Sequence, residues 1–259
     1  MKHIREHQLE LLEMLIEIKK ILYKENINFF LIGGSVLGAI RHNGFIPWDD
    51  DIDIAVYRKD FQKLEEILEK NLKYSKYIYY KAGNKNIIDQ VGRLYVKKEI
   101  EKNEKIKVID IHPIDSIPES KILCFFQFIA VQFYYLFLWQ RPAKNKGRVG
   151  YLITKLLLLL TPQSCWDELK EKINRYIARF SNIETKKIAN IHGIKGYWKE
   201  IMPREYIGTP VLKKFEGEMF YIPEKWHEYL TFLYGDYMKL PDEKDRKPRH
   251  GLKESEESK

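Results

Sequence analysis

Apolar residues recur at helical spacing in several segments of the chain. The first of these segments is amphipathic, with charged residues between its apolar positions, which include Leu9, Leu12, Leu15, Ile16 and Leu22. A helix with such a stripe packs its apolar side on a core, so an N-terminal amphipathic helix is expected. Residues 61–72, 170–180 and 226–234 are predicted to be helices as well, the last of them ending near Gly235.

Short apolar runs between these segments predict strands. Residues 29–32 form such a run and indicate a buried strand, and residues 91–96 and 108–111 read as two further strands. Residues 51–56 alternate polar and apolar side chains, which is the pattern of a strand with two different faces. Residues 215–223 suggest a short hairpin or a strand that ends at a proline.

Four aspartates occupy five successive positions just before and within the 51–56 strand. They are Asp49, Asp50, Asp51 and Asp53. Like charges packed this closely repel one another, so a folded chain that groups them usually binds a cation there. Side chains two apart on a strand project from the same face, so Asp51 and Asp53 are expected side by side, at a spacing suited to one or two Mg²⁺ ions.

A glycine-rich turn precedes the aspartates and predicts an anion site. Gly33, Gly34 and Ser35 follow the 29–32 strand and let the chain turn into a helix over residues 36–40. A helix that opens behind glycines points free backbone N–H groups outward, where they bind phosphate. Phosphate beside metal is what phosphoryl transfer requires. The alternative is a plain turn with a capping serine, followed by a solvated acidic loop.

The string LIGGSVLGAIRHNGFIPWDDDIDIAV closely resembles the signature of the LicD family of phosphocholine transferases, to which the fukutin-type phosphotransferases are related. The similarity resumes at residues 108–115, at FEGEMFYIP and at YGDYMKLPDEKDRKPRH, so it spans most of the chain and covers the middle third least. The resemblance implies a nucleotidyltransferase-like α+β fold, with a mixed sheet, flanking helices and a helical insertion or extension. One departure is His112, where the family usually has an aromatic residue such as Phe.

Asp110 is a candidate for the third carboxylate of the site. It lies between two isoleucines on the predicted 108–111 strand, and a carboxylate framed in this way costs free energy unless it is paired or ligates metal. A hydrogen-bonded structural carboxylate is the alternative. The resemblance implies that a carboxylate from a neighbouring strand completes the metal site and accepts the proton of the attacking hydroxyl. Asp115 resembles a turn residue and ranks second.

Three arginines and three aromatic residues are candidates for binding the donor. Arg93 on the strand beside Asp110 has a guanidinium fork that suits phosphate oxygens, although a surface role is equally compatible with the sequence. The resemblance includes Arg41 and extends to Arg246, which is expected to close over phosphate. A quaternary ammonium needs an aromatic surface, for which the candidates are Trp48, Tyr234 and Tyr237. Glu216, Asp236 and His250 lie within the resemblance without an assigned role.

Charge and cysteine usage limit the partners and the compartment. The formal net charge is +8, but the lysines are scattered and no stacking-aromatic motif organises them, so nucleic acid is not an expected partner. An anionic donor, an anionic polymer acceptor or an acidic membrane surface explains the charge equally well. The two cysteines, Cys124 and Cys165, form no metal-binding pair, and the N-terminus lacks the apolar core of a signal peptide. A cytoplasmic protein is expected.

Residues 122–139 and 151–160 form two nearly unbroken apolar runs, joined by a basic connection at residues 141–148. The first run is just long enough to cross a bilayer and the second is too short. A single crossing would separate the two halves of the proposed site, so a helical hairpin beside the core is expected. This hairpin, 122–160, either makes peripheral contact with anionic lipid at the inner face of the cytoplasmic membrane or forms a plain helical core.

These observations and the resemblance together predict a metal-dependent transferase. Residues 1–118 are expected to form the catalytic core and residues 119–259 a mainly helical region that completes the active site, as one integrated unit. The implied reaction moves phosphocholine, or a similar phospho-alcohol, from a donor such as CDP-choline to a hydroxyl of a cell-surface glycan or its lipid-linked precursor, with release of CMP. Mg²⁺ is the implied cofactor, with Mn²⁺ as its substitute. The alternatives are a true nucleotidyltransferase that releases pyrophosphate and an inactive binding module.

Overall fold

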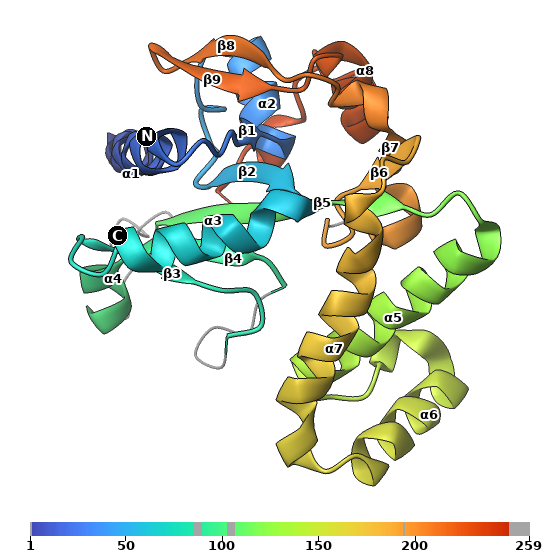
Figure 1. Cartoon of the computed structure of the whole chain (residues 1–259). Helices are drawn as coiled ribbons and strands as arrows, with labels where there is room; N and C mark the ends of the chain where they lie inside the picture. The colour runs from blue at the N-terminus through green and yellow to red at the C-terminus, as the bar shows by residue number, and fades with distance from the viewer. Residues whose placement is uncertain (1, 85–89, 103–106, 194, 249–259) are drawn as a thin grey trace.

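The protein consists of a mixed sheet flanked by helices and of a separate lobe of three helices (Figure 1). The computed structural model describes residues 2–84, 90–102, 107–193 and 195–248. The helices are α1 (Lys2–Lys24), α2 (Gly33–Arg41), α3 (Arg58–Asn71), α4 (Lys97–Lys102), α5 (Lys121–Trp139), α6 (Gly147–Leu160), α7 (Trp166–Ala178) and α8 (Trp226–Tyr234). The strands are β1 (Phe30–Leu31), β2 (Ile52–Tyr57), β3 (Tyr77–Tyr80), β4 (Gly92–Val96), β5 (Val108–Ile117), β6 (Lys187–Ala189), β7 (Ile201–Pro203), β8 (Val211–Phe215) and β9 (Glu218–Ile222). The α+β class predicted from the sequence is confirmed.

The main sheet has the strand order β1-β2-β5-β4-β3, and β6 and β7 extend it from the far end of β5. The pair β2 and β5 is parallel, whereas the other pairs are antiparallel. On one side β5 pairs with β4 up to Ile111 and with β6 from Asp115 onward. Pro113, which lacks a backbone N–H to donate, lies in this interval between two partners, where a proline is tolerated in a central strand.

The predicted amphipathic helices pack on the sheet through their apolar stripes. In α1 Leu15 and Leu22 are fully buried, and in α3 so are Leu64 and Leu68. The two helices also contact each other. Leu9 is the exception to the predicted stripe, because 44% of its surface is exposed. The remaining stripe residues confirm the sequence prediction for both helices.

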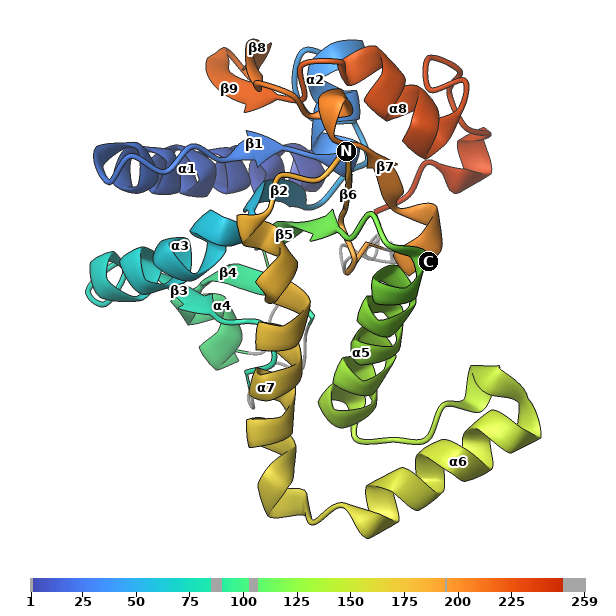
Figure 2. The same ribbon diagram turned by 45° about the vertical axis from the view of Figure 1, so that its right-hand side comes forward.

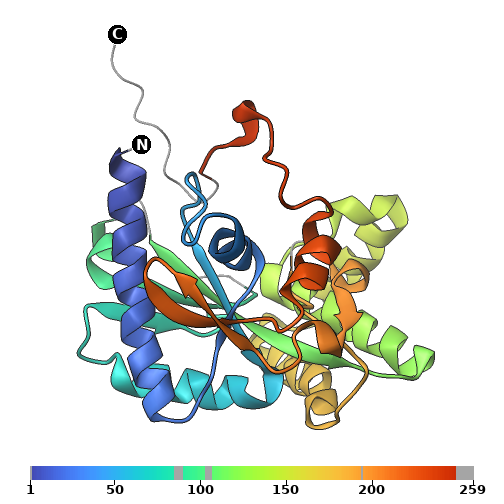
Figure 3. The ribbon, with the colours of Figure 1, turned by 90° about the horizontal axis from the view of Figure 1, so that it is seen from above.

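Helices α2 and α8 lie beside each other on one side of the sheet, and the chain after α8 stays on that side, whereas α3 lies on the other (Figure 3). The predicted hairpin near residue 215 exists as β8 and β9, although it begins at Val211. Its turn residue Glu216 accepts two hydrogen bonds from Arg5 of α1, at 2.9 and 2.6 Å, and one from the N–H of Phe45. Glu216 therefore has a structural role that fastens this hairpin to α1.

Helices α5, α6 and α7 form the lobe that stands away from the sheet (Figure 2). Helices α5 and α7 pack against each other, and Gln127 of α5 donates hydrogen bonds to the carbonyls of Ser116 and Ile177. Residues beyond 119 also supply β6 and β7 to the main sheet, so the two parts of the chain share one sheet. The boundary placed at residue 118 stays a prediction.

Candidate active site

Two carboxylates and a guanidinium form a row across three neighbouring strands. Asp53 of β2 is the register partner of Asp110 of β5, which in turn is the partner of Arg93 of β4. Register partners project from the same face of a sheet, so the three side chains meet there. The Nε and Nη2 atoms of Arg93 lie 2.8 and 3.1 Å from the two oxygens of Asp110. Arg93 therefore fixes Asp110 and is not a surface residue.

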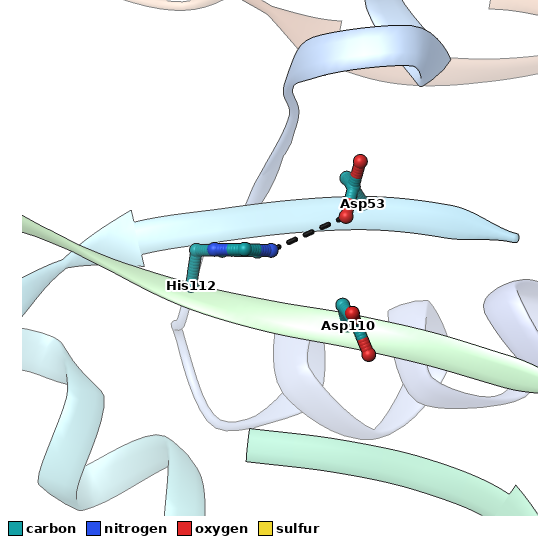
Figure 4. A group of neighbouring side chains, drawn as sticks. All are labelled: Asp53, Asp110 and His112. Carbon is teal, nitrogen blue, oxygen red and sulfur yellow. Dashed lines mark hydrogen bonds and ion pairs between the residues drawn. The ribbon is translucent and has the colours of Figure 1, made fainter. Parts of the chain in front are cut away.

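His112 joins the two aspartates from the same face of β5, two residues after Asp110 (Figure 4). Its Nε2 atom lies 3.2 Å from an oxygen of Asp53, and its Nδ1 atom lies 3.0 Å from the side-chain nitrogen of Asn190. Asp53, Asp110 and His112 each place one ligand atom within 4.8 Å of the others. This spacing fits a single cation held by two carboxylates and one imidazole.

The electrostatics of this triad favour a bound cation. Burial raises the pKa of Asp110 to about 6 against the opposing charge of Arg93, and the negative charge of Asp53 adds to the rise. Burial alone would lower the pKa of His112, but its hydrogen bond to Asp53 and the charges of Asp53 and Asp110 raise it. The negative charges of Asp53 and Asp110 thus raise the pKa values of the neighbouring groups, and a divalent cation would compensate the same charges.

Asp51 belongs to a second group of carboxylates. Its ligand atom lies within 4.8 Å of those of Asp49 and Asp50, whereas Asp53 groups with Asp110 and His112. Asp51 directly precedes β2, which begins at Ile52. Just before it, the carbonyls of Asp49 and Asp50 contact side chains of α1, at 2.9 Å from Gln8 and 2.8 Å from His7. Held in this way, the loop enters the sheet one residue later than the alternating pattern predicts.

The start of α2 lies directly against both acidic groups. A Cβ atom placed on Gly33 would lie 3.1 Å from an oxygen of Asp53, and one on Gly34 would lie 3.0 Å from an oxygen of Asp49. Only glycines allow this close approach, which brings the positive end of the helix to the carboxylates. The predicted anion site and the predicted cation site are therefore adjacent.

Two of the groups expected to cradle phosphate already have partners. The Ser35 hydroxyl accepts a hydrogen bond from the N–H of Asp53 at 3.0 Å, and the Gly33 N–H donates to the Tyr229 hydroxyl at 3.0 Å. The helix cap is Ile32, so Ser35 is not the capping residue of the alternative interpretation. Ser35 instead holds the backbone of the proposed metal ligand in place.

Arg41, Arg246 and Trp48 lie near one another. Arg41 ends α2 and donates a hydrogen bond to the carbonyl of Tyr237 at 2.8 Å. Burial lowers the pKa of Arg41, and the nearby charge of Arg246 lowers it further. The Arg246 guanidinium lies 5.7 Å from the centre of the Trp48 ring. The structure thus brings two predicted phosphate ligands together, and one of them occupies a face of the predicted choline-binding tryptophan.

The two predicted tyrosines differ in exposure. Tyr234 is 43% exposed, and its hydroxyl would lie 3.7 Å from a Cβ on Gly33. The Lys195 ammonium, which also contacts the carbonyl of Leu233, lies 5.8 Å from the centre of the Tyr234 ring. Tyr237 is only 7% exposed and its hydroxyl contacts His227 at 2.8 Å. Tyr234 can therefore face a ligand, whereas the ring of Tyr237 is packed inside the protein.

Some of the residues that complete the site could be found in the sequence and others could not. His112 was visible as a departure from the family pattern, two residues after Asp110. Asn190 and Lys195 lie where the resemblance is weakest, and no motif marked them. Asp115 is not the predicted turn residue, because it is fully buried in β5 and forms an ion pair with Arg58 at 2.7 Å.

Two further residues within the resemblance were predicted without a role. Asp236 follows α8, and its carbonyl accepts a hydrogen bond from the N–H of Lys239 at 3.2 Å, whereas His250 lies outside the described residues.

Comparison with known proteins agrees with the motifs in the sequence. Residues 26–126 match the family described as LicD/FKTN/FKRP, nucleotidyltransferase domain. The lipopolysaccharide cholinephosphotransferase LicD of Haemophilus influenzae is 28% identical over 262 residues, which cover 95% of this chain and 96% of that protein. The ribitol 5-phosphate transferase FKRP of Homo sapiens is 40% identical over 47 residues, 18% of this chain and 10% of that protein. Residues 26–126 of this chain therefore carry a domain of the LicD/FKTN/FKRP type, and the similarity to LicD extends over nearly the whole chain.

Proposed function

We propose that this chain transfers phosphocholine, or a similar phospho-alcohol, from a CDP-activated donor to a hydroxyl of a cell-surface glycan or its lipid-linked precursor, with release of CMP. The observation that carries the proposal is the pair of carboxylates, Asp53 and Asp110, on adjacent parallel strands against the start of α2. The similarity to a cholinephosphotransferase and to a ribitol 5-phosphate transferase supports phospho-alcohol transfer. The donor, the metal and the leaving group are our inference.

Asp53, Asp110 and His112 would hold the metal, because their ligand atoms are spaced for a single cation. Bound Mg²⁺ or Mn²⁺ would neutralise phosphate oxygens as negative charge develops on them. The imidazole distinguishes this set from carboxylates alone and favours Mn²⁺ over Mg²⁺. Asp51 belongs to the neighbouring acidic group with Asp49 and Asp50, and we keep its metal-binding role only there.

The remaining residues bind the donor or take part in proton transfer. Asp110 would accept the proton of an acceptor hydroxyl, while Arg93 fixes its orientation. The start of α2 at Gly34, together with Arg41 and Arg246, would bind the donor phosphates. Tyr234 offers the more accessible aromatic surface for a quaternary ammonium.

A true nucleotidyltransferase is the second candidate, because the matching family is described by a nucleotidyltransferase domain. In that reaction the α-phosphorus of a nucleoside triphosphate is attacked and pyrophosphate leaves. The released product therefore distinguishes the two reactions.

The test incubates the protein with CDP-choline, CDP-ethanolamine, CDP-glycerol or CDP-ribitol, and separately with CTP and phosphocholine, in Mg²⁺ or Mn²⁺. Slow release of CMP from one CDP-alcohol, absent in Asp53→Asn, is the expected result. Pyrophosphate released from CTP would favour the nucleotidyltransferase. Absence of turnover together with absence of metal binding would favour an inactive binding module.

A further inference from the structure

Helix α6 turns its apolar side outward. None of its residues is buried. Its exposed apolar residues are Val149, Leu152, Ile153, Leu156, Leu159 and Leu160, which we call the α6 surface. At about 100° per residue these six positions fall within an arc of about 120°. The less exposed positions, among them Tyr151 and Thr154, fall on the opposite side. An amphipathic helix of a globular protein normally buries its apolar side, whereas α6 exposes it.

Positive charge borders the α6 surface, and negative charge is absent from the whole segment. Arg148 and Lys155 fall at one edge of the apolar arc. No acidic residue lies between Glu119 and Asp167 in the sequence, whereas this stretch contains six basic residues, Lys121, Arg141, Lys144, Lys146, Arg148 and Lys155. Much of the formal net charge of +8 therefore belongs to the lobe of α5, α6 and α7.

The chain that leads into α6 also combines exposed apolar surface with positive charge. Trp139 at the end of α5 is partly exposed, and the Arg141 guanidinium lies 5.3 Å from the centre of its ring. Tryptophan and arginine are typical of the boundary between lipid headgroups and acyl chains, where one end of the side chain is apolar and the other is hydrated. Figure 2 places α6 at the end of the lobe farthest from the sheet, so that a flat surface can reach it.

We propose that the α6 surface docks on an anionic lipid bilayer, with α6 lying in the plane of the interface and the basic residues of 141–148 at the headgroups. Apolar side chains bordered by cations and without acids are complementary to such a membrane, whereas a neutral or cationic partner would leave the positive charge unmatched. The proposal concerns a surface remote from the triad and does not depend on the reaction.

Neither α5 nor α6 needs to cross the membrane. Helix α6 has 14 residues, fewer than the roughly 20 that a span requires. Among the described residues one helix, α5, is long and apolar enough for a span. However, Gln127 of α5 is hydrogen-bonded to Ser116 and Ile177, and Tyr135 to the carbonyl of Ile191. These contacts anchor α5 to β5, to α7 and to the segment after β6, so we assign docking to α6.

The first test measures co-sedimentation of the whole protein with vesicles of phosphatidylcholine alone or mixed with phosphatidylglycerol. We expect binding to the mixed vesicles that weakens as salt is raised, because exposed charges are screened. Leu152→Glu and Leu156→Glu should each weaken binding by about tenfold or more, since each places a charge in the apolar arc. The matched control is Leu212→Glu on β8, also about half exposed, which should bind like the parent.

The second test separates the basic connection from overall charge. Lys144→Gln, Lys146→Gln and Arg148→Gln, combined, should weaken binding and flatten its salt dependence. The control combines Lys20→Gln, Lys24→Gln and Lys70→Gln, three exposed lysines on other helices, and removes the same charge. Equal losses in both triple variants would overturn the proposal in favour of nonspecific attraction.

Two other results would also overturn it. One is the absence of vesicle binding at low salt by parent protein whose circular dichroism shows it folded. The other is self-association without lipid that Leu156→Glu abolishes, because the α6 surface would then bind a second copy of the chain. Light scattering during size-exclusion chromatography measures this oligomeric state.

Discussion

At the scale of single residues, the site combines groups that the sequence marked with groups that it did not. Asp53 and Asp110 were predicted from strand alternation and from the resemblance, and the register places them side by side. Asp51 was predicted with the same rule, but it precedes β2 and groups with Asp49 and Asp50, because alternation cannot say where strand pairing begins. Asn190 was not predicted, because only folding brings it to His112, 78 positions away.

Replacing Asp53 tests which acidic group holds the metal. Asp53→Asn keeps the size of the side chain but removes a charge from the triad, so metal affinity should fall and turnover should drop by at least about a hundredfold. Stability without metal should hold or rise, because Asp110 then loses a repelling neighbour. Calorimetry with Mg²⁺ and thermal unfolding measure both effects.

Asp49→Asn is the matched control, since it removes a charge from the neighbouring acidic group and should be milder. Near-normal turnover of Asp53→Asn together with complete loss of turnover in Asp49→Asn would show that the metal binds at the group of Asp49, Asp50 and Asp51.

His112 tests the nature of the metal. Its imidazole should favour Mn²⁺, so His112→Gln should lower Mn²⁺ affinity by about tenfold while changing Mg²⁺ affinity less. Competition between the two ions, measured by titration calorimetry, gives the ratio of the Mn²⁺ affinity to the Mg²⁺ affinity. Asn190→Ala removes the contact to the other ring nitrogen and should shift the ratio in the same direction but less. Equal losses for both ions in His112→Gln would exclude His112 as a direct ligand.

At the scale of elements, periodicity predicted most helices and strands, because an apolar stripe must be buried wherever the element packs. Its failures have physical causes. Helix α7 begins four residues before the predicted segment, where the apolar stripe is not yet established. The sequence left open whether residues 151–160 belong to a helical core or to a helix at a membrane interface. Because none of the residues of α6 is buried, the structure favours the second interpretation. Hydrophobicity alone does not tell which partner covers a face.

The start of α2 gives a prediction for two neighbouring glycines. Gly34 has no positive φ, so Gly34→Val should fold while its side chain crowds Asp49 and the phosphate path, and affinity for CDP-choline should fall sharply. Gly33 has a φ of +55°, so Gly33→Ala should also destabilise the fold, by about 1 kcal/mol or more. Circular dichroism and donor titration separate the two effects. Unchanged donor binding by folded Gly34→Val would contradict the phosphate site.

At the scale of the whole molecule, a buried ion pair between α3 and β5 lies against helix α7 of the lobe. Arg58, the first residue of α3, pairs with Asp115 of β5 through two hydrogen bonds of 2.7 and 2.9 Å and also approaches Asn174 of α7. Removing one partner of a buried pair leaves an uncompensated charge, which costs about 3–5 kcal/mol. The lobe and the sheet are therefore expected to unfold together, and the stability of the whole chain should report on the titration of its active site.

The dependence of stability on pH and Mg²⁺ follows from the triad. In metal-free protein the pKa of Asp110 is raised from 3.8 to about 6, so the native state keeps a proton that the unfolded chain has lost. The free energy of unfolding should therefore fall as pH rises from about 4 to about 6, by up to about 3 kcal/mol. His112, whose pKa is also raised, should continue the fall above its ordinary value of 6.5.

Mg²⁺ should reverse this trend, because proton and cation compete for the same carboxylates. Denaturant unfolding at pH 5 and pH 7, with chelator or with saturating Mg²⁺, should show a larger gain from Mg²⁺ at pH 7. Asp110→Asn provides the matched variant, since it removes the titrating group. Its unfolding free energy should change less between pH 4 and 6 than that of the parent, and Mg²⁺ should add little at either pH. A gain from Mg²⁺ that is independent of pH, or that survives in Asp110→Asn, would show that the ion binds elsewhere than beside Asp53 and Asp110.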